Sequence, residues 1–241
     1  MERAVRKMED ITMRVIARIQ TDFTTKFGVP RQSGLVPETQ GRIVFEPPYR
    51  NPDALRGLDG FSHLWLIWQF SEAVREEWSP TVRPPRLGGN ARMGVFATRS
   101  PFRPNAIGLS SVALCGIDLH TPDGPVIRVA GADLTDGTPI LDIKPYLAYT
   151  DSHPDATGGF VAGLGERRLT VSCDPDLLEP LSPEARAALP AVLAQDPRPT
   201  YQSDPERVYG MAFGGCEVRF TVNGDTLTVL AVTPSPETPK K

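Results

Sequence analysis

Proline and glycine interrupt this chain throughout, with 25 prolines and 21 glycines among 241 residues. Proline removes the N–H group that a helix interior needs, and glycine favours turns, so long helices are excluded over most of the chain. A hydrophobic content of 40% and a charged content of 23% are those of a folded globular protein. The sequence therefore predicts a core built from short strands that are joined by many turns.

Runs of alternating or β-branched residues, separated by proline and glycine clusters, fill the first 150 positions. Many short strands with turns between them favour a barrel or a sandwich. No glycine-rich turn lies between a strand and a long helix, which disfavours a doubly wound nucleotide-binding fold. We expect strands at residues 12–21, 42–46, 61–70, 93–98, 110–119, 126–130 and 140–144.

The clearest helix signal lies near residue 182. Ser182 is a good N-cap, Pro183 suits the first helical position, and Glu184 suits the first turn. We therefore expect a helix from Pro183 toward Ala194. Pro190 is expected to kink this helix or to end it early, because proline cannot donate the backbone hydrogen bond.

Two other patterns organise the C-terminal part of the chain. Residues 151–165 are polar and glycine-rich and predict a linker, and residues 168–172 predict a strand. Alternating apolar residues at 217–222 and 226–232 flank Asn223-Gly224, which is the strongest short signal of a hairpin. We therefore divide the chain into a β-rich domain of residues 11–150 and a small α+β domain of residues 166–234.

Targeting segments and metal-ligand spacings are not recognisable in the sequence. The first ten residues carry charges of both signs and no apolar stretch, so no signal peptide is expected. The most apolar run, residues 64–68, is far shorter than the roughly 20 residues of a membrane span. The three cysteines and three histidines are scattered. We expect a cytoplasmic protein without a membrane segment, a disulfide frame or a metal.

Residues 78–117 contain no aspartate or glutamate, although the whole chain has a net charge of −3. Exposed arginines that are balanced by acids elsewhere are the simplest interpretation, since charge runs usually face water. Stiff prolines, the exclusive use of arginine and the nearby Phe96 and Phe102 favour instead a surface that binds nucleic acid. The arginines of this segment are Arg83, Arg86, Arg92, Arg99 and Arg103.

Four stretches of the sequence resemble one known family. Residues 81–105 have the sequence TVRPPRLGGNARMGVFATRSPFRPN, and residues 133–146 have the sequence DLTDGTPILDIKPY. Pro30-Arg31-Gln32 and the FSHLW of residues 61–65 accompany them. With these motifs over residues 11–149, and a weaker likeness toward the C-terminus, the chain closely resembles the TrmO family, also called TsaA-like or YaeB-like.

The resemblance implies a fold, an activity and partners. Family members are S-adenosylmethionine-dependent methyltransferases that act on tRNA, at N6 of the threonylcarbamoyladenosine next to the anticodon. They work as dimers that bind the cofactor near the subunit interface. We therefore expect a mainly β protein that binds the anticodon arm and forms a homodimer, with an N-terminal single-sheeted β-barrel and a small α+β C-terminal domain.

Matching the family's motifs residue by residue gives the expected site. Methyl transfer from a sulfonium is an in-line displacement, so the site must align donor and acceptor. A ribose diol suits a carboxylate, and the methionine carboxylate suits arginine or backbone N–H groups. The resemblance implies cofactor contacts from Arg31, Gln32, Ser33, Gly34, Leu35, Glu72, Ala73, Arg99, Leu109, Asp133, Leu134, Thr135 and Asp136. We expect RNA contacts from Arg83, Arg86, Arg92, Arg103, Lys144 and Arg198.

Three residues of the last motif are candidate catalytic groups that accept the proton of N6, namely Asp136, Asp142 and Tyr146. Two of them have a structural alternative. Asp136, which precedes a glycine, can equally cap a turn. Asp142 and Lys144 can equally form the alternating charges of an edge strand.

Two other functions remain open from the sequence. A β-barrel can bind RNA without catalysis, as five-stranded barrels do. A hydrolase that binds an anion at the Gly88-Gly89 loop is a third interpretation, although the sequence lacks the spacing of a P-loop or of a nucleophile elbow.

Overall fold

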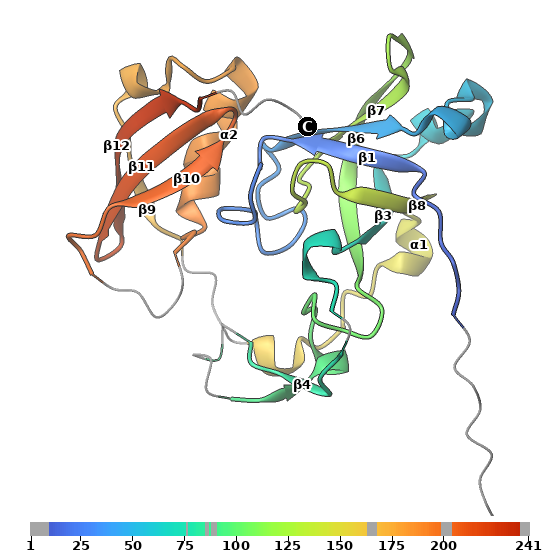
Figure 1. The fold of residues 1–241 in the computed structure, drawn as a ribbon, viewed down its shortest axis with the longest axis horizontal. Coiled ribbons are helices and arrows are strands. Elements are labelled where there is room, and N and C mark those ends of the chain that lie inside the picture. The colour runs from blue at the N-terminus through green and yellow to red at the C-terminus, as the bar shows by residue number, and fades with distance from the viewer. Residues whose placement is uncertain are drawn as a thin grey trace, which may run out of the picture.

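The computed structural model describes residues 10–75, 77–84, 87, 91–162, 168–198 and 204–236 of the chain. Within these ranges the protein is mainly β, with a closed six-stranded barrel and a smaller C-terminal α+β region beside it (Figure 1). A small lobe that contains β4 (Thr81–Val82) lies below both in this view. The predicted fold class is confirmed.

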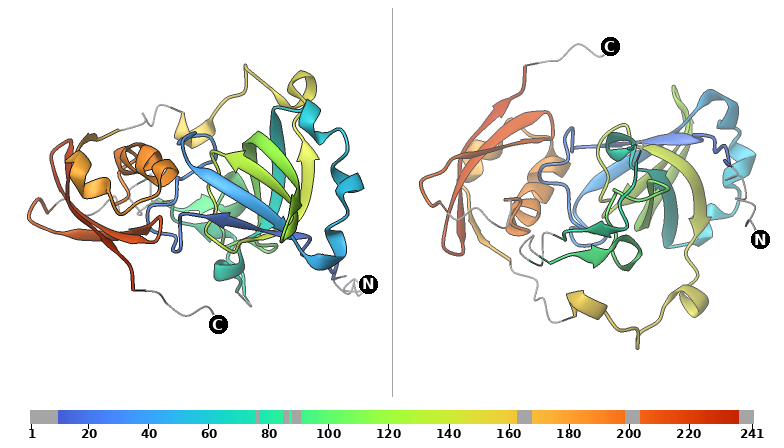
Figure 2. Two further views of the ribbon diagram at one scale, coloured as in Figure 1. Left: turned by 90° about the horizontal axis from the view of Figure 1, so that it is seen from above. Right: turned by 60° about the horizontal axis from the view of Figure 1, so that its bottom comes forward.

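Six antiparallel strands close the barrel (Figure 2). In spatial order they are β1 (Ala17–Thr21), β2 (Gln40–Phe45), β7 (Gly124–Ala130), β6 (Ile107–Thr121), β3 (His63–Gln69) and β8 (Pro139–Pro145). The alternating sequence decides which side chains face inward. In β3, Leu64, Leu66 and Trp68 are buried and the residues between them are not.

The C-terminal region is a four-stranded sheet packed against one helix. The sheet has the order β10 (Tyr209–Phe213), β11 (Cys216–Asn223), β12 (Thr226–Pro234) and β9 (Thr170–Ser172). The β11–β12 pair is the predicted hairpin. Helix α2 (Pro183–Ala194) begins where the Ser182 hydroxyl oxygen accepts a hydrogen bond from the Ala185 N–H at 3.2 Å. The predicted hairpin and the predicted start of the helix are confirmed.

The remaining elements are short. Strand β5 (Met93–Gly94) pairs with β4, and α1 (Ala148–Asp151) is a single turn after β8. The 3-10 segments span Pro47–Tyr49, Pro52–Leu55, Leu58–Gly60, Ser71–Ala73, Val95–Ala97, Gly159–Val161 and Pro175–Leu178. Within the described ranges, no helix has the length and hydropathy needed to cross a membrane. Among the same residues, no three His, Cys, Asp or Glu side chains are grouped so that they could hold a metal ion.

Two expected strands are shorter in the structure by four residues or more. The strand expected at residues 12–21 begins only at Ala17, so the prediction of a strand at residues 12–16 is wrong. The strand expected at residues 93–98 ends at Gly94, and a 3-10 turn follows. The Thr98 N–H and hydroxyl both donate to the Val95 carbonyl, at 3.1 and 2.8 Å. This local bonding of Thr98 competes with strand pairing.

Helix α2 continues through Pro190 to Ala194, so the expected early end is wrong. Leu189, Val192 and Leu193 lie on both sides of the proline and are at most 1% exposed. Their burial against the sheet outweighs the backbone hydrogen bond that proline cannot make.

Two hydrophobic cores lie on either side of the β1–β2 connection. One core fills the barrel, and the other joins α2 to the C-terminal sheet. Phe23 and Val36 belong to the β1–β2 connection, yet both are buried in the C-terminal core, each 1% exposed. The division of the chain at residues 150 and 166 stays a prediction, and this connection crosses between the two cores.

Asp22 lies where the barrel meets the C-terminal core. Burial, followed by the charges of Glu184 and Asp136, raises the pKa of its carboxyl above the ordinary value. The folded protein therefore holds this proton more tightly than the unfolded chain does. Stability is lost as the pH rises from the unfolded pKa of 3.8 through the raised folded pKa.

We expect Asp22→Asn to raise the melting temperature at pH 7 by about 1–3 °C, because the neutral amide removes the repelled charge. Scanning calorimetry at two pH values measures the effect. Below pH 3.8, where the aspartate is protonated in both states, the difference should vanish. A variant that melts at or below the temperature of the unsubstituted chain at pH 7 would show that this charge is not repelled.

Candidate functional site

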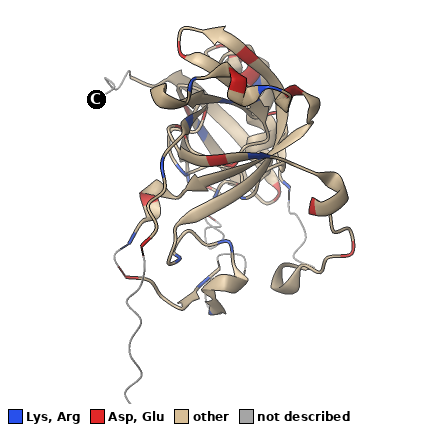
Figure 3. Ribbon diagram, turned by 90° about the vertical axis from the view of Figure 1, so that its right-hand side faces the viewer, with Lys and Arg blue, Asp and Glu red and all other residues tan. Residues whose placement is uncertain are grey.

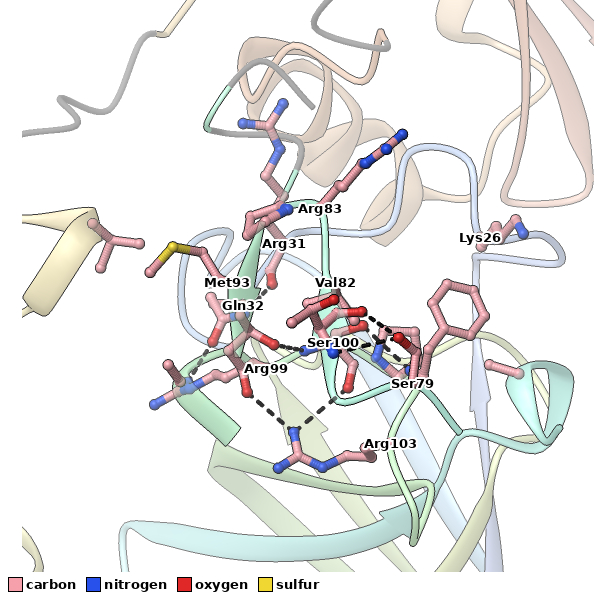
Figure 4. A pocket seen from close by; sticks show the side chains of 18 of the residues that line it. Lys26, Arg31, Gln32, Ser79, Val82, Arg83, Met93, Arg99, Ser100 and Arg103 are labelled. Atoms are coloured by element: carbon pink, nitrogen blue, oxygen red, sulfur yellow. Dashed lines mark hydrogen bonds between the residues drawn. The ribbon is translucent and has the colours of Figure 1, made fainter. Parts of the chain in front are cut away.

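A groove of about 2330 Å³ lies between the loops of the barrel, the lobe of β4 and β5, and the C-terminal region (Figure 4). Its lining comes from segments that are far apart in the chain: residues 26–32, 73–75, 77–84, 92–105, 157–161 and 192–198. Figure 4 shows Arg31, Arg83 and Arg99, which belong to different loops, around the same hollow. The fold therefore assembles this groove from non-local pieces.

The groove is strongly cationic, and basic residues recur along the loops of the lobe (Figure 3). Within the described residues, its acidic lining consists of Asp10, Glu77 and Asp196. A surplus of positive charge in a concave surface attracts a polyanion. The basic side chains that line the groove are Lys26, Arg31, Arg75, Arg83, Arg92, Arg99, Arg103 and Arg198.

Two of these arginines stiffen the loop that follows β5. The Arg103 guanidinium donates to the carbonyl oxygens of Thr98 at 3.1 Å and of Ser100 at 3.5 Å. Arg75 lies over the ring of Phe102, with 3.8 Å between the guanidinium carbon and the ring centroid. These contacts pre-organise the loop that presents Arg99 to the groove.

Two aromatic side chains of the lobe are more than half exposed. Trp78 is 52% exposed and Phe96 is 73% exposed, and their ring centroids are 6.1 Å apart. Exposed aromatic rings next to arginines are typical of surfaces that bind single-stranded nucleic acid, because bases stack on the rings.

Arg99, Gln32, Ser33 and Asp133 meet beside the groove, and we call these four residues the Asp133 corner. Arg99 donates a hydrogen bond to the side-chain oxygen of Gln32, and both residues line the groove. The Ser33 N–H donates to the Asp133 carboxylate, on which the charge of Arg99 also acts. The structure thus places Arg99 and Asp133 at one site, although 33 positions separate them in the chain.

Two side chains inside the barrel, Ser110 and Trp68, orient the Asp133 carboxylate through a chain of two hydrogen bonds. The Ser110 hydroxyl donates to Oδ1 of Asp133 at 2.5 Å, and Nε1 of Trp68 donates to the Ser110 oxygen at 3.0 Å. Because an indole N–H can only donate, the proton of Ser110 is directed toward Asp133. Gly108 leaves the space that the Trp68 ring occupies, since a Cβ atom there would collide with the indole.

Burial raises the pKa of the Asp133 carboxyl above its ordinary value. The hydrogen bonds from Ser110 and Ser33 and the charge of Arg99 act in the opposite direction and offset part of this rise. A half-buried carboxylate that is oriented by hydrogen bonds and faces an arginine is typical of a ligand-binding site.

Only the first residue of the stretch Asp133, Leu134, Thr135 and Asp136 belongs to this corner. Leu134 is 1% exposed and packs in the barrel core, and Thr135 bonds within its own turn. Oδ1 of Asp136 accepts a hydrogen bond from the Thr21 N–H at 3.1 Å. The Asp136 carboxylate therefore bonds to the backbone of β1, which differs from the local turn cap of its structural alternative.

The other residues expected to bind the cofactor are spread over a wider area. Leu109 is 56% exposed on the outer face of β6, and Glu72 is exposed in the 3-10 turn after β3. Neither is among the described residues that line the groove. Four residues expected to bind the cofactor remain. Arg31 and Ala73 line the groove, and Gly34 and Leu35 follow Ser33 in the β1–β2 connection.

The three candidate proton acceptors also lie outside the described lining of the groove. Asp142 forms an ion pair with Lys144 on β8, with 3.0 Å between Oδ2 and Nζ. Strand β8 pairs with both β3 and β1 in the closed barrel, so the expectation of an edge strand is wrong. Tyr146 packs against Trp65, with 5.5 Å between the ring centroids. The catalytic roles of Asp136, Asp142 and Tyr146 stay predictions.

The residues expected to bind RNA divide into three groups. Arg83, Arg92 and Arg103 line the groove. Arg198 also lines it, but its side chain is 8% exposed and its guanidinium donates to both carboxylate oxygens of Asp196, at 2.8 and 2.9 Å. Lys144 lies on β8 outside the described lining, and Arg86 lies outside the described residues.

Sequence reasoning missed Trp68 and Ser110 as parts of the site. A signal was available for Ser110, because it is a polar residue at an inward position of β6, between Gly108 and Val112. A buried hydroxyl on an otherwise apolar strand face needs a hydrogen-bond partner. The motif that begins with Asp133, after the neighbouring strand β7, offers a carboxylate as that partner. The contributions of Lys26 and of residues 195–197 had no comparable signal, since they depend on how the two cores pack.

Comparison with known proteins relates both parts of the chain to one family. The family model of the tRNA-methyltransferase O N-terminal domain matches residues 18–152, and the TrmO C-terminal domain matches residues 171–235. A tRNA (adenine(37)-N6)-methyltransferase of Escherichia coli is 41% identical over 235 residues, which cover 94% of this chain and 100% of the relative.

Two further relatives extend the comparison. A Pseudomonas aeruginosa protein whose name describes an S-adenosylmethionine-dependent methyltransferase is 39% identical over 85% of this chain and 90% of its own. A crystal structure of TrmO from Pseudomonas aeruginosa superposes with a TM-score of 0.74 and 32% identity, covering 93% of this chain and 100% of that one. The chain belongs to the TrmO family.

Proposed function

We propose that this protein transfers a methyl group from S-adenosylmethionine to N6 of adenine 37 in tRNA. The observation that carries the proposal is the Asp133 corner, where a half-buried carboxylate faces Arg99 at the side of a cationic groove. The reaction is that of the family, whose members from Escherichia coli and Eikenella corrodens are named tRNA (adenine(37)-N6)-methyltransferases.

The Asp133 corner fits the groups that S-adenosylmethionine presents. The Asp133 carboxylate can accept hydrogen bonds from the ribose hydroxyls, and Arg99 and Arg31 can pair with the methionine carboxylate. Partial burial strengthens these interactions, because the local dielectric constant is lower than that of water. When bound, the cofactor supplies an electrophilic methyl group on a positively charged sulfur.

Positioning is the main contribution of the chain to such a displacement. Ser110 and Trp68 fix the Asp133 carboxylate from inside the barrel, and Gln32 fixes the Arg99 guanidinium. The donor would therefore be held by side chains that are themselves immobilised. The neighbouring groove would hold the acceptor base in line with it.

The groove would accommodate the anticodon arm of tRNA. Arg83 and Arg92 line it and can contact phosphates, while Trp78 and Phe96 offer rings on which unpaired bases can stack. We further propose that the target adenine carries a threonylcarbamoyl group. The carboxylate of that group suits the surplus of cations in the groove.

The proposal includes a cytoplasmic homodimer. Ile107 and Leu109 are 38% and 56% exposed on the outer face of β6, an apolar surface that a second copy would cover. Cys115, Cys173 and Cys216 are free thiols, which suits a reducing compartment. Light scattering during size exclusion measures the mass, and a monomer at all concentrations would remove the dimer from the proposal.

Mass spectrometry of nucleosides tests the reaction itself. Purified protein is incubated with S-adenosylmethionine that carries a deuterated methyl group, and with tRNA with and without the threonylcarbamoyl group. We expect the deuterated methyl on N6 of the adenosine next to the anticodon, and only in the threonylcarbamoylated tRNA. Tight binding of tRNA with no transfer would favour the RNA-binding barrel without catalysis and would overturn the proposal.

A further inference from the structure

We propose that the C-terminal region acts as a clamp on the β1–β2 connection and thereby positions the part of the cofactor site that this connection carries. The inference rests on the proposed function, because it assigns cofactor binding to Gln32 and Ser33. Strand β10 is the proposed clamp, and Met211 and Phe213 are its positioning residues.

The contacts between β10 and the connection are close and specific. The rings of Phe23 and Phe213 pack edge to face, with 5.2 Å between their centroids. The Gly214 N–H donates to the Asp22 carbonyl at 3.0 Å. The thioether of Met211 packs directly on Gly28, where a Cβ atom would collide with it.

Gly28 adopts a left-handed conformation with a φ of 92°, which glycine tolerates and other residues rarely adopt. The absence of a side chain at Gly28 permits the left-handed backbone turn, and it also leaves room for the close approach of Met211. The connection is therefore shaped to fit against β10.

Burial shows that the connection depends on the C-terminal core more than on the barrel. Phe23 and Val36 are each 1% exposed within that core. Phe27, Val29 and Leu35 are half-buried and pack against the same cluster. The apolar residues of the connection therefore surround the short stretch that reaches the Asp133 corner.

Gln32 and Ser33 follow the clamped segment closely in the chain. Only three residues separate Gly28 from Gln32, which is a span of about 13 Å when fully extended. Between them, Arg31 donates to the Asp196 carbonyl at 3.3 Å, a second contact with the C-terminal region. A shift of the segment at β10 would therefore move Gln32 and Ser33 relative to Arg99 and Asp133.

The barrel fixes the connection on the far side of the cofactor residues, and it also contacts the start of the connection, where the Asp136 N–H donates to the Phe23 carbonyl at 2.7 Å. The Gly34 N–H donates to the Gly131 carbonyl at 2.8 Å, and the Gly131 N–H donates to the Thr39 carbonyl at 3.0 Å. Gln32 and Ser33 thus lie between an anchor on the barrel and an anchor on the C-terminal region. Both anchors are needed to define their positions.

The experiment compares two cavity-forming variants of the same core. Met211 and Leu227 are 1% and 0% exposed, but Leu227 lies on β12, two strands away from β10. Met211→Ala and Leu227→Ala should both lower the melting temperature, by about 5–10 °C. S-adenosylmethionine binding is then measured by titration calorimetry at a temperature where every variant is folded.

We expect Met211→Ala to weaken cofactor binding about tenfold, because Gln32 and Ser33 lose their fixed placement. Leu227→Ala should leave the affinity within about twofold, and Met211→Leu, which conserves volume, should restore it. If Met211→Ala does not fold, Phe213→Leu tests the Phe23 contact in the same way. Equal affinities in all variants that fold would overturn the clamp.

Failure of the clamp is distinguishable from failure of the proposed function. If the unsubstituted chain binds S-adenosylmethionine and the variants bind it equally well, only the clamp is wrong. If the unsubstituted chain itself shows no binding of S-adenosylmethionine, the proposed function is wrong, and the clamp that rests on it is wrong as well.

Discussion

Asp133→Asn is expected to weaken the binding of S-adenosylmethionine by about 10–100-fold, because a hydrogen bond to a charged group contributes about 1.5–3 kcal/mol. The substitution keeps the shape of the side chain but removes its charge. It also leaves the Ser110 hydroxyl facing a neutral amide instead of a carboxylate. Titration calorimetry with the purified variant measures the loss.

The pH dependence of binding gives this prediction a second readout. Because burial raises the pKa of Asp133, its carboxylate is protonated at a pH where an ordinary aspartate is still ionised. Cofactor affinity should therefore fall as the pH decreases through this raised pKa. In Asp133→Asn that decrease should be absent, since the amide does not titrate.

The matched control is Asp118→Asn. Asp118 is another aspartate of the barrel, on β6, and it forms an ion pair with Arg128 at 2.9 Å outside the described lining of the groove. We expect cofactor affinity in this variant to stay within about twofold of the unsubstituted chain. An equal loss in both variants would indicate a general effect on folding, and no loss in Asp133→Asn would exclude this carboxylate from the cofactor site.

The double substitution Arg83→Gln and Arg92→Gln is expected to lower tRNA affinity by about tenfold or more at physiological salt. Both arginines line the groove, and neither is one of the four residues of the Asp133 corner. Each neutralised phosphate contributes about 0.7 to the slope of log K against log salt for a single strand. The slope should therefore become shallower by about 1.4.

Arg56→Gln is the control for this charge effect. The side chain of Arg56 is 81% exposed and pairs with Asp53 in a 3-10 segment outside the described lining of the groove. Binding of tRNA is measured by fluorescence anisotropy at several salt concentrations. A double variant with the same slope as the unsubstituted chain would show that RNA does not contact these arginines.

Much of the fold could be predicted from local patterns. The alternating Leu64, Leu66 and Trp68 of β3 predict an inward face, because side chains of a strand alternate between its two sides. Ser182 and Asn223-Gly224 predict a helix start and a hairpin, because capping and tight turns depend on a few neighbouring residues. Such features need no knowledge of distant contacts.

The errors in the predicted fold lie where a distant or competing contact determines the local structure. Pro190 does not end α2, because the helix is held by burial of its face against the sheet. Strand β10 was not predicted, although Tyr209, Met211 and Phe213 alternate with small residues at 210 and 212. That short alternating run was a usable signal.

The motifs that contribute to the proposed site could be predicted from the sequence, but the relative positions of their side chains could not. Arg99 and Asp133 meet at one corner, as the resemblance implies for residues that bind one cofactor. The neighbouring Asp136 belongs to the same motif, yet its carboxylate bonds to the backbone of β1. Sequence alone does not tell which acid of such a motif faces a ligand, because this depends on the turn that follows β7.

A crystal structure with S-adenosylhomocysteine, the product of methyl transfer, is the most direct test of the Asp133 corner as the cofactor site. The account predicts ribose hydroxyls within hydrogen-bonding distance of the Asp133 carboxylate, and the amino-acid end of the ligand at Arg99 or Arg31. A ligand bound instead on the outer face of β8, beside Asp142 and Lys144, would contradict it.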